Sequence, residues 1–523
     1  MLPESLGYLF DAPLALAPSR PAVLQDDLAL SFQVLDERCN RLANALLSLG
    51  AKPGARIGLL FGNDFRFVES LLAPMRIGAV TVPLNIRMGD DALAYVVNDA
   101  EAEIVVASAG LAHRARTLLD RLPRVRHLIV DGPPLAGSLA YDGLLDNASC
   151  ELARRRIDPE AICLQPYTSG STGNPKGVLL AHAGQIWNAD LVRKAGAFDQ
   201  TERGLIAVPL FHKNALVATK ALLLAGGSIV ILPAFDPAEV IRAIERYHVT
   251  YLTGVPAMYK LILAQHDLLR QHRVNTVRYA MCGSAEVPEE LLEEFRRGFG
   301  APLVEGYGLT EGGPVPIINL RWGVHRRGSC GRAAPGSEVK VVADDGTTEL
   351  GPGQVGELIV RNPGIAKGYW RLPEVTARKF RNGWLYTGDL MRYDAEGFYY
   401  YVGRRDDMIN VAGENMYPKE VEDILMRHTN VRDVCVVPAP HAIKGEVPVA
   451  FVVEKVSGAT NEEELQAFFL ARGAAYAHPR RVYFLDALPL GGTGKVDRSA
   501  LKQLAMASGP ISARGVTPSG EYR

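Results

Sequence analysis

The chain has 523 residues, of which 48% are hydrophobic and 7% aromatic, and 57 Lys+Arg against 58 Asp+Glu give a net charge of −1. At roughly 100–200 residues per domain, this length predicts several domains with a large buried core. A protein that grips a phosphate polymer normally carries a clear basic excess, so the balanced charge argues against nucleic-acid binding.

The six cysteines are scattered and form no CxxC pair, so the sequence shows neither a disulfide framework nor a zinc site. The start of the chain contains Glu4 and Asp11 and lacks a basic leader, so no signal peptide is expected. The most apolar run, 221–232, is interrupted by Gly226-Gly227 and falls short of the ~20 residues that a membrane span needs. We therefore expect a soluble, cytoplasmic protein without an integral membrane segment. The oligomeric state stays open, with a homodimer among the alternatives.

Short β-branched runs alternate with amphipathic stretches through the first part of the chain. Stretches 67–77 and 92–99 keep apolar residues at helical spacing. Strands that alternate with helices predict right-handed crossovers and two largely parallel sheets buried on both faces. The expected strands are 57–60, 79–82, 104–107, 128–130, 205–208, 229–232, 250–253 and 277–281.

The predicted secondary structure changes in the last third of the chain. After about residue 330, short strands and Gly/Pro turns predict a mostly antiparallel region. Beyond 404, strands at 434–437 and 449–453 and a helix opened by Asn461 predict an α+β unit. The predicted fold class is α/β. A large N-terminal domain, 1–403, holds two mostly parallel sheet layers and a distorted β-barrel region; a small mobile α+β lid domain, 404–505, and a flexible tail, 506–523, follow.

The most specific segment is a loop rich in hydroxyls and glycine that ends in Asn174-Pro175-Lys176-Gly177. Glycine lets backbone N–H groups turn toward an anion, hydroxyls donate to phosphate oxygens, and lysine supplies the counter-charge. A Walker A loop would place its lysine at the start of a helix, whereas β-like residues follow here, so a different phosphate loop is predicted. A flexible linker is the alternative, but linkers rarely carry a central Pro-Lys-Gly. The expected phosphate contacts are Thr168, Ser169, Gly170, Ser171, Thr172, Gly173 and Lys176.

Further motifs follow this loop in a fixed order. They are Gly306-Tyr307-Gly308-Leu309-Thr310-Glu311, Tyr386-Thr387-Gly388-Asp389, Gly403-Arg404-Arg405-Asp406-Asp407 and Gly491-Gly492-Thr493-Gly494-Lys495. Together with the phosphate loop they cover residues 167–495 and resemble the signatures of the adenylate-forming (AMP-binding) superfamily. That superfamily contains acyl-CoA synthetases, including fatty-acid and coumarate-type CoA ligases, peptide-synthetase adenylation domains and luciferases.

The resemblance implies a two-step reaction. A carboxylic acid attacks the α-phosphate of Mg²⁺-bound ATP and releases pyrophosphate; the thiol of coenzyme A then attacks the acyl-adenylate and releases AMP. It also implies nucleotide contacts from Gly283, Ser284, Ala285, Gly306, Tyr307, Gly308, Thr310, Asp389 and Arg404. Tyr307 would stack on the purine, Asp389 and Arg404 would hold the ribose, and Thr310 would donate to the α-phosphate. Glu311 offers the hard oxygen that Mg²⁺ prefers.

Lys495 corresponds to the family lysine that bridges the attacking carboxylate and the α-phosphate. A cation there stabilises charge that develops in the transition state. The resemblance further implies that the C-terminal unit rotates about a hinge at Asp406 between the half-reactions. Coenzyme A would then pass close to the backbone at Gly413, where no side chain blocks its pantetheine arm.

The acyl pocket is the least defined part of the site. The resemblance assigns it His212, as a gating and catalytic residue, and Asn214, Pro314 and Val315. No residue matches the aspartate that amino-acid adenylation domains place opposite the substrate amine, so an acid without an α-amino group is favoured. Lys213 either faces solvent or points inward, where it would meet a polar or acidic distal group of the acid together with Lys220 further along.

Two other functions stay open at this point. A stand-alone adenylation enzyme would transfer the acyl group to a carrier-protein phosphopantetheine instead of free coenzyme A. A basic patch for the 3′-phosphate of coenzyme A would separate these two, and Arg326-Arg327 and Lys444 are candidates. A catalytically silent nucleotide-binding protein of this fold is the third alternative, and the joint presence of Lys176, Glu311, Asp389, Arg404 and Lys495 argues against it.

Overall fold

A computed structural model describes residues 2–168, 174–283, 287–313, 315–411, 414–441, 444–490 and 496–507. The chain divides into two compact units. Unit 1 comprises 1–340, 359–387 and 394–399, and unit 2 comprises 341–358, 388–393 and 400–523. Segments 341–358 and 388–393 thus pack with the C-terminal residues, and the proposed domain boundary at 403/404 stays a prediction. No helix in the described ranges has the length and apolar character needed to cross a membrane.

Unit 1 contains a seven-stranded sheet in the order β11-β8-β4-β3-β5-β6-β7. Neighbours from β4 through β7 run parallel, and β11 pairs with β8 antiparallel. Strand β4 is buried at every position, as the β-branched runs predict for a parallel sheet covered on both faces. The strands are β3 (Arg56–Leu60), β4 (Val80–Pro83), β5 (Ala102–Ala107), β6 (His127–Val130), β7 (Ser138–Ala140), β8 (Ile162–Leu164) and β11 (Leu180–Ala181).

A second sheet of unit 1 has nine strands in the order β18-β17-β16-β15-β14-β12-β13-β1-β2. Its centre, from β1 through β16, is parallel, and its two edges are antiparallel. These sheets confirm the predicted α/β class with two mostly parallel layers. The strands are β1 (Pro21–Gln25), β2 (Leu28–Ser31), β12 (Arg203–Ile206), β13 (Ser228–Ile231), β14 (Tyr251–Gly254), β15 (Tyr279–Gly283), β16 (Leu303–Tyr307), β17 (Ile317–Ile318) and β18 (Arg332–Ala333).

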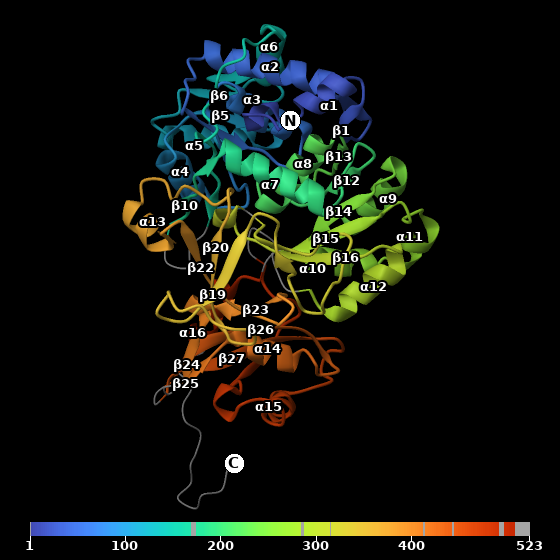
Figure 1. Cartoon of the computed structure of the whole chain (residues 1–523), viewed down its shortest axis with the longest axis vertical. Helices are drawn as coiled ribbons and strands as arrows, with labels where there is room; N and C mark the ends of the chain where they lie inside the picture. Colours follow the sequence, from blue (N-terminus) through green and yellow to red (C-terminus); the bar gives the residue numbers. More distant parts are fainter. Residues whose placement is uncertain are drawn as a thin grey trace, which may run out of the picture. The chain divides into compact units, whose positions relative to one another are not determined.

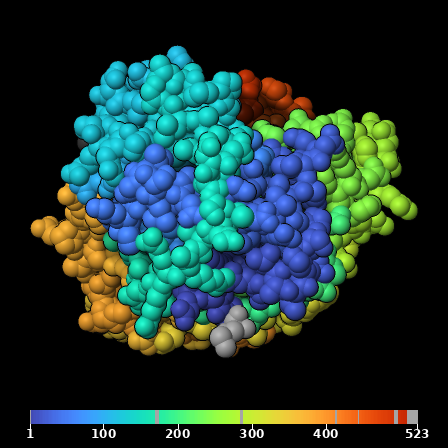
Figure 2. Space-filling view, turned by 90° about the horizontal axis from the view of Figure 1, so that it is seen from above, coloured from blue at the N-terminus to red at the C-terminus, as the bar shows by residue number. Residues whose placement is uncertain are grey.

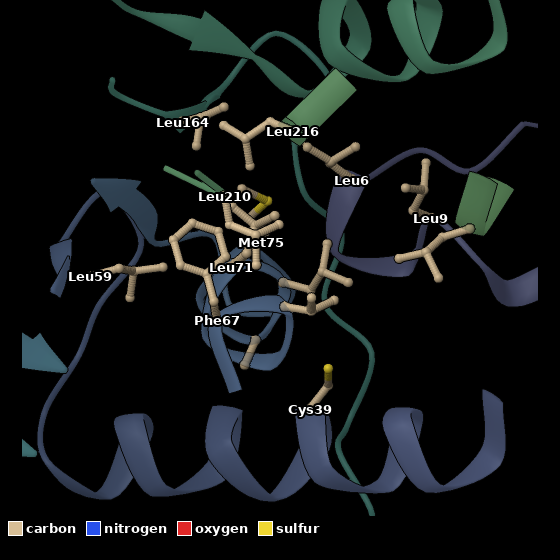
Figure 3. Packing of buried hydrophobic residues seen from close by; sticks show 14 of the residues in the cluster. Leu6, Leu9, Cys39, Leu59, Phe67, Leu71, Met75, Leu164, Leu210 and Leu216 are labelled. Carbon is tan, nitrogen blue, oxygen red and sulfur yellow. The ribbon is translucent and has the colours of Figure 1, made fainter. Parts of the chain in front are cut away.

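Helices cover the sheets, and one continuous apolar core joins them. In Figure 1, α7 (His182–Ala195) and α8 (Lys213–Ala225) lie between the blue-to-cyan strands and the green strands. Figure 3 shows how Leu6, Leu71, Leu164 and Leu216 meet in this core although they come from distant parts of the sequence. The other helices of unit 1 are α1 (Asp11–Leu16), α2 (Phe32–Ser48), α3 (Phe65–Arg76), α4 (Asp90–Asp99), α5 (Ala112–Leu118), α6 (Tyr141–Asp146), α9 (Pro237–Tyr247), α10 (Pro256–Leu263), α11 (His266–Gln271), α12 (Glu289–Phe299) and α13 (Pro373–Lys379).

Local sequence signals fix where several helices begin. The hydroxyl of Ser31 accepts a hydrogen bond from the Val34 N–H at the start of α2, and the carboxylate of Asp64 accepts from the Arg66 N–H at the start of α3.

Segment 147–156 crosses the outer side of α2, where Asn44 donates to the Ser149 and Glu151 carbonyls. The teal band over the blue surface in Figure 2 shows this crossing.

The last third of the chain forms two further five-stranded sheets. The residues expected to form the barrel region make β19 (Glu338–Val342), β20 (Gly356–Arg361), β21 (Phe380–Arg381), β22 (Trp384–Tyr393) and β23 (Tyr399–Arg404). Unit 2 adds β24 (Ile409–Val411), β25 (Glu414–Met416), β26 (Val431–His441), β27 (Gly445–Glu454) and β28 (Val482–Phe484), with α14 (Pro418–Leu425), α15 (Glu462–Leu470) and α16 (Arg498–Ala507). Asn461 caps α15 by accepting from the Glu464 N–H, as predicted.

A buried histidine makes the stability of unit 1 depend on pH. The Leu6 N–H donates to Nδ1 of His182 at 3.0 Å, and burial lowers the pKa of His182 to about 4. In the unfolded chain His182 has a pKa near 6.5. Its contribution to the free energy of unfolding is therefore fully present above that pH and is lost as the pH drops toward 4. We expect acidification from pH 7 to pH 5 to lower the free energy of unfolding of the native protein by about 2 kcal/mol more than that of a His182→Gln variant. Urea unfolding of both proteins at both pH values measures the difference, and equal losses would contradict the role of this side chain.

Candidate active site

The carboxyl ends of parallel strands bring several predicted site residues to one edge of the nine-stranded sheet. Gly283 ends β15 and lies beside Gly306 near the end of β16, and Gly254 ends the neighbouring strand β14. Tyr307 is the last residue of β16 and is half-buried. In open parallel sheets this edge is where ligands bind. These predicted nucleotide residues therefore meet where the topology favours a ligand site.

The phosphate loop is closed at its base by a short antiparallel pair. Strand β9 (Tyr167–Thr168) pairs with β10 (Lys176–Gly177), so that Thr168 lies opposite Lys176. The space at Gly177 is tight, because a Cβ atom would come within 2.8 Å of the Gln165 amide nitrogen and 3.0 Å of the Tyr167 ring, so these side chains would have to shift. The base of the loop thus presents a hydroxyl and an ammonium group from the same short hairpin.

Glu311 lies close to this hairpin although the two motifs are far apart in sequence. Thr168 Oγ1 donates to Glu311 Oε1 at 3.4 Å, and the phenol of Tyr369 donates to the same oxygen at 3.0 Å. Tyr369 also places its ring 5.9 Å from the Lys176 ammonium. The sequence interpretation missed Tyr369, because an isolated Gly-Tyr-Trp triplet carries no signature and its contact arises only when Tyr369 bridges to Val178.

The turn that carries Glu311 is held by close backbone packing. Thr310, Glu311 and Gly312 form the 3-10 helix η4 (Thr310–Gly312), and the Asn362 amide donates to the Gly312 carbonyl at 3.0 Å. Gly313 adopts φ +88°, and a Cβ atom there would lie 2.6 Å from the backbone of Gly364. The carboxylate of Glu311 and the hydroxyl of Thr168 are hard oxygen donors of the kind that Mg²⁺ prefers, so this pair fits that cation.

The predicted acyl-pocket residues lie at the start of α8 and beside β17. His212 is the N-cap residue of α8 and is half-buried. The Asn214 amide donates to the Gly254 carbonyl at 3.4 Å, and its carbonyl oxygen accepts from Thr253. Val315 packs against a small apolar cluster that contains Leu191, Ile318 and Ala334.

Lys213 points into the protein. Its ammonium group donates to the carbonyl of Gly308, inside the second signature motif. This contact selects the inward orientation over the solvent-facing one. The hypothesis that Lys213 meets a polar group on the acid stays a prediction.

Unit 2 brings together the predicted ribose-binding pair. Arg404 Nη1 lies 3.1 Å from Asp389 Oδ1, and the Asp389 side chain is 7% exposed. Arg405, next in sequence, is partly exposed and lies 3.1 Å from the buried carboxylate of Glu357. Asp406 lies in the 3-10 helix η5 (Arg405–Asp407), and its role as a hinge stays a prediction.

A group of basic side chains, His441, Lys444, His478 and Arg480, gathers elsewhere in unit 2. Nη1 of Arg480 lies 2.7 Å from Nε2 of His478, and the Lys444 N–H donates to His441 Nδ1 at 3.2 Å. Burial lowers the pKa of Lys444 and of His478, and the nearby Arg480 charge lowers both further. Arg480 Nε is buried without a partner, and no carboxylate pairs with Lys444 or Arg480 in the described part of unit 2. Crowded cations of this kind are typical of an anion site.

Several predicted residues lie outside the described parts of the chain. Their proposed roles in phosphate, nucleotide, acyl and coenzyme A binding stay predictions. They are Ser169, Gly170, Ser171, Thr172, Gly173, Ser284, Ala285, Pro314, Gly413 and Lys495.

The sequence matches the profiles of two known protein domains. The profile of the AMP-binding enzyme family covers residues 10–370, and that of the AMP-binding enzyme C-terminal domain covers residues 420–495. The chain is 35% identical to a feruloyl-CoA synthase from Amycolatopsis over 491 residues, which is 93% of this chain and 96% of that protein. It is 31% identical to a long-chain-fatty-acid–CoA ligase from Bacillus subtilis over 95% of this chain and 94% of that ligase.

Solved structures resemble the whole chain as well. The anthranilate CoA ligase AuaEII, in complex with anthranoyl-AMP, superposes with a TM-score of 0.89 and 27% identity over 97% of this chain and 98% of that chain. ATP-bound MatB from Rhodopseudomonas palustris gives a TM-score of 0.88 and 29% identity over 95% of this chain and 98% of that chain.

Proposed function

The chain belongs to the adenylate-forming superfamily of AMP-binding enzymes and is an ATP-dependent acyl-CoA synthetase, and we propose which of its residues act in each of the two half-reactions. The observation that carries this assignment is the meeting of Thr168, Glu311 and Lys176 at the base of one phosphate loop. Thr168 and Lys176 belong to the phosphate loop and Glu311 belongs to the second motif, and the fold gathers them next to the carboxyl edge of the sheet. A protein that only bound a nucleotide base would not need them together.

In the first half-reaction, a carboxylate oxygen bonds to the α-phosphorus of ATP while the bond to the pyrophosphate oxygen breaks. Thr168 and Lys176 bind the phosphates, and Thr310 donates to the α-phosphate. Glu311 and Thr168 would hold Mg²⁺, which when bound neutralises phosphate charge. Tyr369 orients the Glu311 carboxylate through its 3.0 Å hydrogen bond. Lys495 would hold the two reacting anions together, so that catalysis consists mainly of positioning and charge neutralisation.

In the second half-reaction, the thiol sulfur bonds to the acyl carbonyl carbon, AMP leaves, and the thiol proton passes to solvent. The basic group formed by His441, Lys444, His478 and Arg480, in which Lys444 and Arg480 carry the positive charge, supports free coenzyme A as the acceptor. Coenzyme A carries a 3′-phosphate and a pyrophosphate, whereas the phosphopantetheine arm of a carrier protein carries a single phosphodiester. A crowded cationic site therefore favours the free coenzyme.

The assignment is tested by following pyrophosphate and AMP separately. Purified protein is incubated with ATP, Mg²⁺ and a panel of fatty, aryl and dicarboxylic acids, with and without coenzyme A. We expect pyrophosphate release that depends on the acid, and release of AMP and thioester only when coenzyme A is present. Formation of acyl-adenylate without any transfer of the acyl group to coenzyme A would refute the proposal that coenzyme A is the acceptor. No pyrophosphate release with any acid would refute the proposal that the enzyme activates acids.

Removal of the basic group is expected to weaken the preference for the complete coenzyme. In a Lys444→Ala/Arg480→Ala variant, the ratio of kcat/KM for coenzyme A to that for pantetheine should fall about 10-fold or more, because charge-assisted hydrogen bonds to phosphate are lost. Arg472→Ala serves as the control, since this arginine lies on an exposed part of the same unit and stacks on Phe468. An unchanged ratio in the double variant would show that the phosphates bind elsewhere.

A further inference from the structure

A small cavity lies against α7 and α8, and apart from Thr310 its lining residues have no role in the reaction outlined above. Its walls include Gln185 of α7, Lys213 and Lys220 of α8, and Thr310 of η4. Leu164 and Leu216 complete an apolar side, and Figure 3 shows both pointing into the same core. All of these residues belong to unit 1. The cavity therefore combines apolar walls with two ammonium groups.

Lys220 is a buried cation whose hydrogen-bond partner is neutral. The side chain is 2% exposed, and its ammonium group donates to Gln185 Oε1 at 2.5 Å. No carboxylate pairs with Lys220 within the described ranges. Cys163 lies nearby, but burial raises the pKa of this thiol to about 12, so it stays uncharged at neutral pH. Burying an ammonium group without an anion is costly, and here the pKa of Lys220 falls to about 8 through desolvation.

Gln185 has a hydrogen-bond donor to spare in the same place. Its Nε2 atom is buried and makes no hydrogen bond to any described residue, while its Oε1 atom accepts from Lys220. Buried amide groups are normally satisfied, so an unpaired donor on a cavity wall indicates a missing acceptor. A carboxylate would satisfy both groups at once, because one oxygen can accept from the amide while its charge pairs with the ammonium.

The cavity lies next to the reacting centre. Thr310 forms part of its wall and is the residue proposed to donate to the α-phosphate. If Thr310 has that role, a substrate group inside the cavity would lie on the same side of the site as the carboxyl group that is activated. Apolar walls exclude water and strengthen a charge pair formed between them. The cavity volume is about 20 Å³, which is enough for a water-sized group such as one carboxylate oxygen and too small for a triphosphate.

We propose that this cavity receives a second carboxylate of the acid substrate, which pairs with Lys220 and accepts from Gln185, so that the enzyme selects short dicarboxylic acids or their aromatic counterparts. This inference rests on the proposed function and specifies its substrate class. Lys213, which points inward beside the same cavity, adds positive charge to the wall.

The test compares each dicarboxylic acid with its monocarboxylic partner: succinate with butyrate, glutarate with pentanoate, and phthalate with benzoate. The measured quantity is the ratio of the two kcat/KM values for AMP formation with coenzyme A present. In Lys220→Met this ratio should fall about 10- to 100-fold for the preferred pair, because a buried charge-assisted contact is lost. Lys194→Met is the matched control, since Lys194 lies on α7 but is exposed and pairs with Asp190 at 2.7 Å.

A second variant keeps the lysine and changes its partner. Gln185→Glu supplies an internal carboxylate to Lys220, so it should also abolish the preference for the dicarboxylic acid. An equal ratio in wild type and in both variants would overturn the inference. A rise in KM for ATP that is the same with both acids of a pair would overturn it too and would assign the cavity to a phosphate group.

The outcome for wild type separates this inference from the proposed function. Turnover of monocarboxylic acids without any turnover of dicarboxylic acids would overturn the substrate class and leave acid activation standing. A wild-type enzyme inert toward every acid would overturn the proposed function and, with it, this inference.

Discussion

Replacement of Lys495 with alanine is expected to slow acyl-adenylate formation by ~10²–10³, the range seen when one electrostatic donor is removed from an active site. The reason is that a carboxylate and a phosphate, both anions, must approach each other before the new bond forms. A positioned ammonium group offsets their repulsion and stabilises the charge that develops on the phosphate. Acid-dependent pyrophosphate release in the absence of coenzyme A measures this step alone.

The second half-reaction provides the internal control for this variant. When synthetic acyl-adenylate and coenzyme A are supplied, Lys495 has no anions to bring together, so thioester formation should lose far less than adenylation. Lys455→Ala, which changes an exposed lysine of unit 2, should affect neither step. Equal losses in both half-reactions would indicate a structural role for Lys495 instead of a role in adenylation.

The architecture could be predicted in large part because it depends on local patterns. A continuous apolar run such as 57–60 indicates a strand buried on both faces, and the structure has β3 there. The order of the motifs likewise predicted that Thr168 and Glu311 serve one site, and the fold places their oxygens 3.4 Å apart. Strand ends in unit 1 differ from the prediction by up to two residues, and β26 and β27 extend up to four residues beyond the predicted 434–437 and 449–453, since backbone pairing continues or stops independently of side-chain type.

Contacts made by the tertiary fold could not be predicted in this way. Tyr369 reaches Glu311 only because a backbone bridge joins it to Val178 across the unit. Lys213 is polar and lies next to an apolar run, so its spacing fits an exposed or an inward side chain equally well; the carbonyl of Gly308 on another segment decides between them. The pairing of Lys220 with Gln185 depends in the same way on how two helices pack. Such contacts need the three-dimensional arrangement, because no local pattern encodes them.

A Glu311→Gln variant is expected to lose at least ~100-fold in kcat/KM and to need a higher Mg²⁺ concentration for half-maximal activity. The substitution keeps the shape of the side chain. The amide oxygen can still accept from Thr168 and Tyr369, so the loop geometry that these hydrogen bonds support should survive. What is lost is the negative charge, and with it the hard anionic ligand that Mg²⁺ favours over a neutral amide. A Mg²⁺ titration at fixed ATP concentration measures the shift.

Tyr369→Phe separates the charge of Glu311 from its orientation. This variant removes only the phenol that donates to Glu311 Oε1, so the carboxylate keeps its charge and loses one of its supports. We expect a loss of about 10-fold, in line with a single hydrogen bond, and a Mg²⁺ dependence close to that of wild type. If Glu311→Gln instead left the Mg²⁺ titration unchanged while Tyr369→Phe shifted it, the cation would bind through other oxygens. The carboxylate would then serve to position the phosphate loop through Thr168, and the assignment of Glu311 as a metal ligand would fall.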